Sequence, residues 1–271
     1  MQWSKIKNIV ILLLLLANVL LLAQVVVREM ESERYHRQAR EEAAALLAQN
    51  GIRVDLGELP DDPQLFPMRC ERDIQREKDL AASLLGQASE QEDGSYAGTC
   101  GTMWFYSSGD FLAHLEPTAF PVGEKSETDV AAEVMERLDF QGQLRSVTEE
   151  DGRVLVELYQ LWEQVPVFSC QVTLTFDGGQ LTQIQGRRMP GDPVSQGGTG
   201  AMTVTTALVR FLSAAAEGGY VCSEIREMTA GYSMTAVPTS STFRLSPIWQ
   251  IETDAGNFRL DADGTLTQVT E

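Results

Sequence analysis

The stretch Thr175-Phe-Asp-Gly-Gly-Gln-Leu-Thr-Gln-Ile184 recurs, one residue longer, as Arg259-Leu-Asp-Ala-Asp-Gly-Thr-Leu-Thr-Gln-Val269. Both stretches place an Asp and a glycine-containing turn before Leu-Thr-Gln and a β-branched residue. Glycine supplies the positive φ that a tight hairpin turn needs. Both stretches therefore predict β-hairpins, and Phe105–Leu115 is a weaker third copy.

A helical pattern precedes each predicted hairpin. These predicted helices cover Arg72–Leu85, Thr128–Leu138 and Val204–Glu217. Further strands are predicted at Arg153–Trp162, Val165–Leu174 and Pro247–Glu252. The pattern predicts an α+β fold in which a unit of one helix and an antiparallel meander is used three times. The units would cover residues 51–120, 121–190 and 191–271, with the linker Met189–Gly200 near the last boundary.

The N-terminal region contains a long apolar run, Ile9–Val27, broken only by Asn18 and Gln24. At about 1.5 Å per residue, the run is long enough for a transmembrane helix. A cleaved signal peptide is the alternative, but bulky Val25–Val27 stand where small residues are expected. The sequence therefore predicts a single-pass protein in the cell membrane. It would have a cytoplasmic N-terminal stub (residues 1–8), a transmembrane helix (9–27), a stalk helix (28–50) and an extracytoplasmic main domain.

Asn18 and Gln24 are candidate binding residues within this run. An amide in hydrocarbon costs free energy unless it is paired, so either residue could hydrogen-bond to a partner helix. For Asn18, near the middle of the run, this interpretation and that of a tolerated polar residue stay open. For Gln24, near the end of the run, the tolerated polar residue is favoured.

The composition is strongly acidic, with a net charge of −18 and 43% hydrophobic residues. Lys5, Lys7 and Arg28 are the only charged side chains among the first 28 residues, so every acidic residue follows them. This charge argues against nucleic-acid binding, because phosphate backbones would be repelled. The hydrophobic content argues against a wholly disordered chain.

Residues that could carry catalysis are few. The two histidines, His36 and His114, have no ligand spacing for a metal ion. Gly197–Gly200 lacks the Lys of a phosphate-binding loop, and Asp261–Gly264 lacks the closing Glu of a calcium loop. No catalytic residue, metal or cofactor is therefore predicted, and the chain is not expected to be an enzyme.

Four cysteines are candidates for two disulfides: Cys70, Cys100, Cys170 and Cys222. An even number of cysteines outside the cytoplasm permits such bonds. On sequence grounds the least strained pairings are Cys70–Cys100 and Cys170–Cys222. Free, buried thiols are an equal alternative.

The opening Met1-Gln-Trp-Ser-Lys-Ile-Lys-Asn-Ile-Val10 resembles the start of YycI-type proteins, in which such a motif precedes one long apolar helix. The segment Gly57–Pro60 and the strand Leu245-Ser-Pro-Ile-Trp-Gln-Ile251, followed by Gly256–Ala262, are similar too. The C-terminal motif is also shared, loosely, with PepSY-like modules. The resemblance covers the whole length and the order of elements.

This resemblance implies a YycH/YycI-like fold and a regulator of the YycFG (WalRK) cell-wall two-component system. The implied partners are a YycH-like protein and the sensor histidine kinase, contacted through the transmembrane helix and the extracytoplasmic domain. One alternative is a PepSY-like binding module that inhibits or chaperones an extracytoplasmic protease. Another is an anchored hydrolase, which the scarcity of histidine disfavours.

Overall fold

The computed structural model describes residues 18, 21–22, 24 and 33–269 of the chain. The described helices are α2 (Ile74–Leu85), α3 (Glu127–Arg137), α4 (Val204–Gly218) and one over residues 33–49. The strands are β1 (Arg53–Val54), β2 (Met68–Glu71), β3 (Ser89–Glu90), β4 (Tyr96–Gly98), β5 (Gly101–Phe105), β6 (Asp110–Leu115), β7 (Gly142–Glu150), β8 (Arg153–Trp162), β9 (Val165–Asp177), β10 (Gln180–Arg187), β11 (Val194–Ser195), β12 (Glu224–Ala236), β13 (Thr242–Thr253), β14 (Gly256–Asp261) and β15 (Leu266–Val269).

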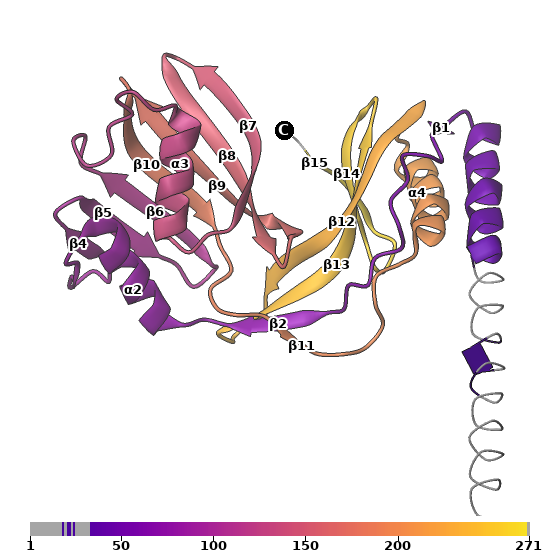
Figure 1. The fold of residues 1–271 in the computed structure, drawn as a ribbon, viewed down its shortest axis with the longest axis horizontal. Helices are drawn as coiled ribbons and strands as arrows, with labels where there is room; N and C mark the ends of the chain where they lie inside the picture. The colour runs from indigo at the N-terminus through magenta and orange to yellow at the C-terminus, as the bar shows by residue number, and fades with distance from the viewer. Residues whose placement is uncertain (1–17, 19–20, 23, 25–32, 270–271) are drawn as a thin grey trace, which may run out of the picture.

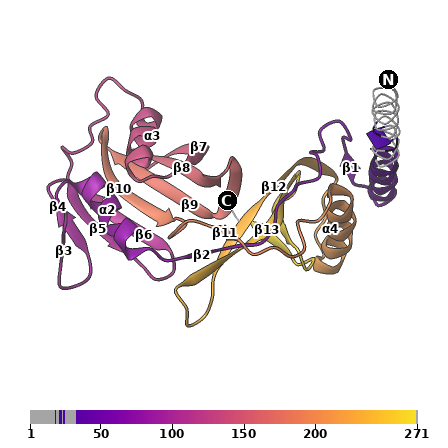
Figure 2. The ribbon, with the colours of Figure 1, turned by 60° about the horizontal axis from the view of Figure 1, so that its bottom comes forward.

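The elements form two lobes that diverge from a common base (Figures 1 and 2). The first lobe contains β3–β10, and α2 and α3 cover one face of its strands. The second lobe contains the helix over residues 33–49, β1, α4 and β12–β15. Strands β2 and β11 lie at the base, between the lobes.

All described strands belong to one mixed sheet. Its main path runs β11-β2-β13-β12-β9-β10-β6-β5-β4-β3, and β14–β15 and β7–β8 branch from β13 and β9. Strand β12 runs parallel to β9, with Tyr232 opposite Val167, and parallel to β1. The other named strand pairs are antiparallel. The lobes are therefore two arms of one sheet, which separate beyond the contact between β9 and β12.

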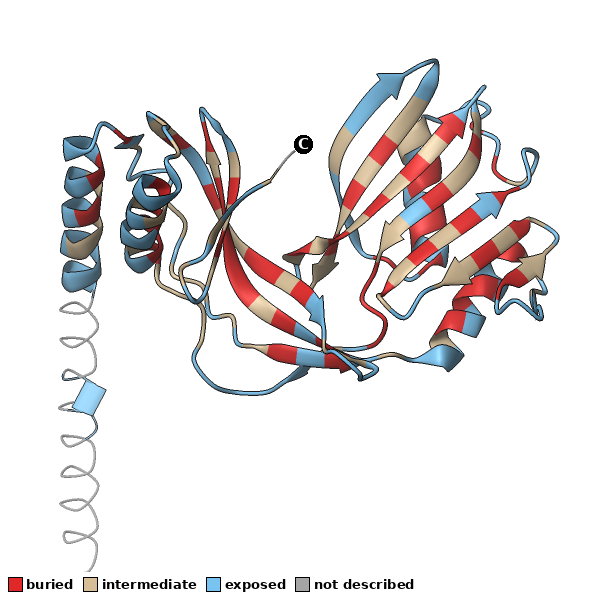
Figure 3. Ribbon diagram, turned by 180° about the vertical axis from the view of Figure 1, so that it is seen from behind, coloured by how far each residue is buried: buried red, intermediate tan, exposed pale blue. Residues whose placement is uncertain are grey.

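The described residues form three hydrophobic cores, and buried residues alternate along the strands of both lobes (Figure 3). One core lies between α2, α3 and the first-lobe strands. A second lies between α4, the helix over residues 33–49 and β12–β14. The third, which we call the junction core, joins the lobes. Its buried residues are Met68, Cys70, Val167, Cys170, Met189, Tyr232, Met234, Phe243 and Leu245.

Local chemistry fixes the ends of the helices. The side chains of Asp73, Ser126 and Thr203 cap the N-termini of α2, α3 and α4 by accepting hydrogen bonds from backbone N–H groups. The helix over residues 33–49 ends at Asn50-Gly51. Gly51 has a φ of 84°, and the N–H of Ile52 donates to the carbonyl of Leu47 over 3.0 Å. This 6→1 bond is that of a Schellman motif, so the chain leaves the helix here.

The three hairpins predicted from the repeat are confirmed as β5–β6, β9–β10 and β14–β15. In β9–β10 the turn residues Gly178 and Gly179 have φ values of 57° and 74°. Positive φ at both central residues is the geometry of a type I′ turn, which only glycine, Asn and Asp adopt readily. The three helices predicted before the hairpins are also present, with small shifts at their ends.

The predicted fold class, three repeated units of one helix and a meander, is wrong. The described strands form one mixed sheet of 15 strands, in which β6 pairs with β10 and β9 with β12 across the supposed units. A separate meander would leave two strand edges with unpaired backbone groups, and pairing between the units removes most of these edges. Helices α2 and α3 also share one core instead of covering separate units. The predicted domain boundaries stay predictions.

The predicted transmembrane helix is contradicted as well. Among the described residues, no helix is long and apolar enough to cross a membrane. The helix over residues 33–49 carries charged residues such as Glu33, Arg37 and Glu41, which a membrane span would exclude. The same finding contradicts the prediction of a single-pass protein in the cell membrane. Most of Ile9–Val27, and the predicted stub over residues 1–8, lie outside the described residues.

One long strand, β7, was not predicted. A β-bulge between Leu144 and Ser146 interrupts the period-two alternation that would have revealed it. The available signal was Asp151-Gly152, a strong hairpin dipeptide directly before the correctly predicted strand β8.

Gly191→Ala should destabilise the protein, because Gly191 allows β2 to approach the chain that leaves β10. A Cβ atom at this position would lie 2.1 Å from the carbonyl oxygen of Glu71. We expect a loss of roughly 1–3 kcal/mol in the free energy of unfolding, measured by urea denaturation. Val194→Ala is the control: its side chain is 62% exposed, and the change should stay within about 0.5 kcal/mol. Equal effects of the two substitutions would contradict the expected close approach.

Asp110→Asn should change how stability depends on pH. Burial raises the pKa of the Asp110 carboxyl, but hydrogen bonds from Arg187 and Ser108 outweigh it, so the pKa lies below its ordinary value. A lowered pKa contributes stability above the unfolded-state pKa of about 4, and this contribution is lost as pH falls through the folded-state pKa. The variant should lose about 0.5–1 kcal/mol near neutral pH, because the ion pair is partly exposed. Urea denaturation should show this difference shrinking below about pH 3, and a constant difference would rule out the titration.

Candidate protein-binding site

Strand β7 is the main open edge of the sheet. It has nine residues and, of the strands that the structure describes, pairs with β8 alone. Among the described strands, the others with a single neighbour are β1, β3 and β11 (two residues each) and β15 (four residues). In Figure 1, β7 borders the first lobe on the side that faces the second lobe. A long open edge can pair with another extended chain, whereas short edges are protected by their length.

Two apolar side chains of β7 lie on the same face. Leu144 pairs with Leu158, and Val147 pairs with Val156. Both β8 residues point into the first-lobe core, so Leu144 and Val147 continue the apolar surface of that core at its margin. They are 51% and 48% exposed. The bulge between Leu144 and Ser146 places them on one face despite their spacing of three.

The β7–β8 turn determines which backbone groups of β7 are available. Asp151 and Gly152 both have positive φ, 51° and 76°, as in a type I′ turn. In such a hairpin the flanking pair Glu150–Arg153 is hydrogen-bonded, and bonded and non-bonded pairs then alternate along the strands. Val147 and Glu149 therefore occupy non-hydrogen-bonded positions. Their N–H and C=O groups point away from β8, toward the open edge.

The opposite face of β7 is joined to the second lobe by a row of two aromatic rings with an arginine at each end. Arg145 donates to Glu157 over 3.2 Å and lies 5.5 Å from the ring centre of Tyr159. Tyr159 makes an edge contact with Phe168 at 5.6 Å, and Arg259 of β14 lies 5.7 Å from the Phe168 ring. Such cation–π contacts are each worth about 0.5–1 kcal/mol or more. The row therefore helps to hold β7 in place relative to β14.

Arg259 and Gln250 each have one buried side-chain atom that makes no hydrogen bond to the described residues. Arg259 Nη2 donates to the carbonyl of Phe168 over 3.0 Å, but its buried Nε has no hydrogen-bond partner among the described residues. The buried Oε1 of Gln250, opposite Arg259 in the β13–β14 ladder, also lacks one. Burial lowers the pKa of the Arg259 guanidinium.

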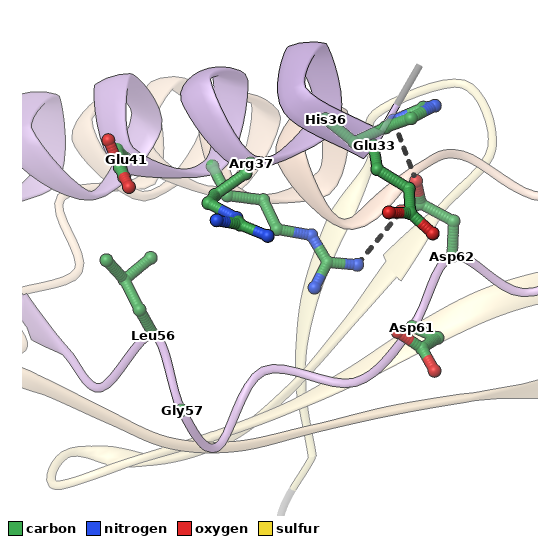
Figure 4. Close-up of a pocket in the computed structure, with 9 residues that line it drawn as sticks. Glu33, His36, Arg37, Glu41, Leu56, Gly57, Asp61 and Asp62 are labelled. Carbon is green, nitrogen blue, oxygen red and sulfur yellow. Dashed lines mark ion pairs between the residues drawn. The ribbon is translucent and has the colours of Figure 1, made fainter. Parts of the chain in front are cut away.

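A second candidate is a cavity of about 760 Å³ between the helix over residues 33–49 and the segment 55–62 (Figure 4). Charged side chains dominate its lining. Asp62 forms an ion pair with Arg40 at 3.8 Å, and the Nδ1 atom of His36 lies 3.5 Å from the same carboxylate. Asp62 also accepts a 2.7 Å hydrogen bond from the N–H of Val204, at the start of α4. This carboxylate therefore fastens the helix to α4, and His36 lies at this contact.

The structure does not bring the predicted site residues together. Asn18 and Gln24 are helical and exposed. His114 is exposed on β6, where its ring packs edge-on against Trp104. Within the described residues, no three His, Cys, Asp or Glu side chains are grouped so that they could hold a metal ion.

The cysteines lie in three different places, and all four are free thiols in the structure. Cys70 and Cys170 are buried in the junction core, Cys100 packs against the first-lobe core, and Cys222 packs against the second. Neither predicted pairing is formed. Burial raises the pKa of the Cys70 thiol to about 11 and raises that of Cys170 further. The oxidation state of the native protein stays a prediction.

The four cysteines should differ in how fast their thiols are labelled. Thiolate is the reactive form, so Cys70 and Cys170 should react far more slowly than the partly exposed Cys100 and Cys222. Iodoacetamide labelling of the native chain at about pH 8, followed by peptide mass spectrometry, measures each rate. All four should react in denaturant. Protection of Cys100 or Cys222 that persists in denaturant and ends with reductant would show a disulfide instead.

No protein-family model matches the chain, and no curated protein matches its sequence. Among solved structures, it is similar to an uncharacterized protein from Eubacterium rectale ATCC 33656. That alignment has a TM-score of 0.44 and 10% identity, and covers 81% of this chain and 90% of the other. It is also similar to the C-terminal domain of Bacillus megaterium YpeB, with a TM-score of 0.39, 9% identity, and coverage of 74% and 99%. These likenesses are too distant to assign a fold or a function.

Proposed function

We propose that this chain is a non-enzymatic regulatory protein that binds other proteins through the open edge of β7. The observation that supports this most directly is a nine-residue edge strand with two half-exposed apolar side chains, Leu144 and Val147. An extended segment of a partner can add to such an edge. Backbone hydrogen bonds then provide affinity, and side chains on alternate positions provide specificity.

The surroundings of β7 suit a pre-formed binding strand. The bulge at Arg145, the type I′ turn at Asp151-Gly152 and the contact of Arg145 with Tyr159 restrict its conformation before a partner arrives. A strand that is already ordered loses little conformational entropy on binding.

The partners implied by the resemblance to YycI-type proteins are a YycH-like protein and a sensor histidine kinase, and we propose these two as the first to test. A PepSY-like module that binds a protease would use protein–protein contacts as well, so the binding surface and the partner must be tested separately.

The experiment measures binding of the full chain to the YycH-like protein and to the sensor kinase of the same organism, by biolayer interferometry. Leu144→Ser with Val147→Ser should weaken binding by about tenfold or more, because both side chains would lose apolar contact area. The matched control is Val194→Ser on β11, which is also exposed but lies at the base of the lobes.

Urea denaturation should show that both variants keep the fold. Unchanged affinity of the double variant, or equal weakening by Val194→Ser, would contradict β7 as the contact surface. Binding of only one of the two candidate proteins would identify the partner.

A further inference from the structure

The charges at the end of β7 have no ion-pair partners within the described chain. Glu149, Glu150 and Asp151 are all exposed. The two basic residues of the same hairpin are engaged elsewhere: Arg145 pairs with Glu157 at 3.2 Å, and Arg153 pairs with Asp177 at 3.4 Å. The open edge is therefore apolar in its middle, at Leu144 and Val147, and negative at its C-terminal end.

This charge distribution argues against a second copy of the chain as the occupant of the edge. The chain carries a net charge of −18, so two copies repel each other. Charged residues on an edge strand are a common protection against such pairing of identical sheets. The same charges attract a partner of opposite sign and speed its association.

On the basis of the proposed function, we infer that β7 receives an extended, basic segment of a partner protein. The segment runs antiparallel to β7, with its basic residues at its N-terminal end and apolar residues in its middle. Its backbone pairs with the outward N–H and C=O groups of Val147 and Glu149. Its apolar side chains contact Leu144 and Val147, and its basic side chains face Glu149, Glu150 and Asp151.

The antiparallel direction is the one that strand pairing in general favours. Antiparallel pairing is slightly more stable per residue than parallel pairing. In that direction, the N-terminal end of the added segment lies beside the C-terminal end of β7. Basic residues at the start of the segment then meet the three unpaired carboxylates.

Two synthetic nine-residue peptides of identical composition test this inference on the full chain. Both alternate Val and Thr; one carries two Arg residues at its N-terminal end and the other at its C-terminal end. Both are capped at their termini and labelled with a fluorophore. Fluorescence anisotropy should show that the N-terminal Arg peptide binds at least about fivefold more tightly, with the difference decreasing as salt is added. Equal affinities, or tighter binding of the C-terminal Arg peptide, would overturn the proposed segment.

Two protein variants separate the role of charge from that of backbone pairing. Glu149→Gln with Glu150→Gln and Asp151→Asn removes the charges, and Asn keeps the positive φ of the turn. This variant should bind the N-terminal Arg peptide about tenfold more weakly. Val147→Pro removes one outward N–H while sparing the ladder with β8, and should reduce binding to near background. Val147→Ala keeps that N–H but loses most of the apolar contact, so the weakening by Val147→Pro beyond that of Val147→Ala reports the loss of the backbone donor.

The outcomes distinguish the inference from the proposed function. Loss of peptide binding with Val147→Pro, but not with the charge variant, would overturn the basic segment and leave β7 as a binding strand. Full binding by Val147→Pro, with urea denaturation showing an intact fold, would overturn strand addition itself. If Leu144→Ser with Val147→Ser also left protein binding unchanged, the proposed function would fail with it.

Discussion

The contact between β9 and β12 holds the two lobes in one sheet. Tyr232 lies opposite Val167, and the N–H of Met234 donates to the Ser169 hydroxyl over 2.6 Å. Gly231 permits this close approach, because a Cβ atom there would lie 2.5 Å from the carbonyl of Pro166. The junction core then forms around the contact, and Cys70 and Cys170 are buried within it. Beyond it the strands separate, and no second strand of the described chain reaches β7.

The sequence predicted the local structure well. Hairpins and helix ends depend on residues close together in the chain, such as Gly178-Gly179 in a type I′ turn and the stop at Asn50-Gly51. The strand order could not be predicted in the same way. Pairs such as Arg69 with Arg244, or Gly186 with Phe111, join residues far apart in sequence, and nothing local specifies them. A repeated hairpin motif therefore suggested separate units where one sheet exists.

The candidate site could not be predicted for two physical reasons. An open edge is a property of the finished sheet, since β7 would be an inner strand if any other strand reached it. The bulge beside Arg145 also removes the alternation by which a strand of this length is recognised. Residue types gave little help, because Leu144 and Val147 resemble core residues, and the acids at the end of β7 resemble an ordinary solvated surface. By contrast, His36 is one of only two histidines in the sequence, and in the structure it contacts the carboxylate of Asp62.

The chain enters the second lobe, leaves it and returns. Residues 33–54 supply a helix and β1 to the second lobe, the first lobe occupies a continuous segment between β2 and β11, and α4 and β12–β15 complete the second lobe. During synthesis, the first lobe is thus whole before its neighbour has received its main strands. We expect it to fold as it leaves the ribosome. Ala43, Leu47 and Ile52, in contrast, stay uncovered until Phe211 and Trp249 have been synthesised. Because those contacts are far apart in sequence, we expect the second lobe to fold more slowly than the first lobe.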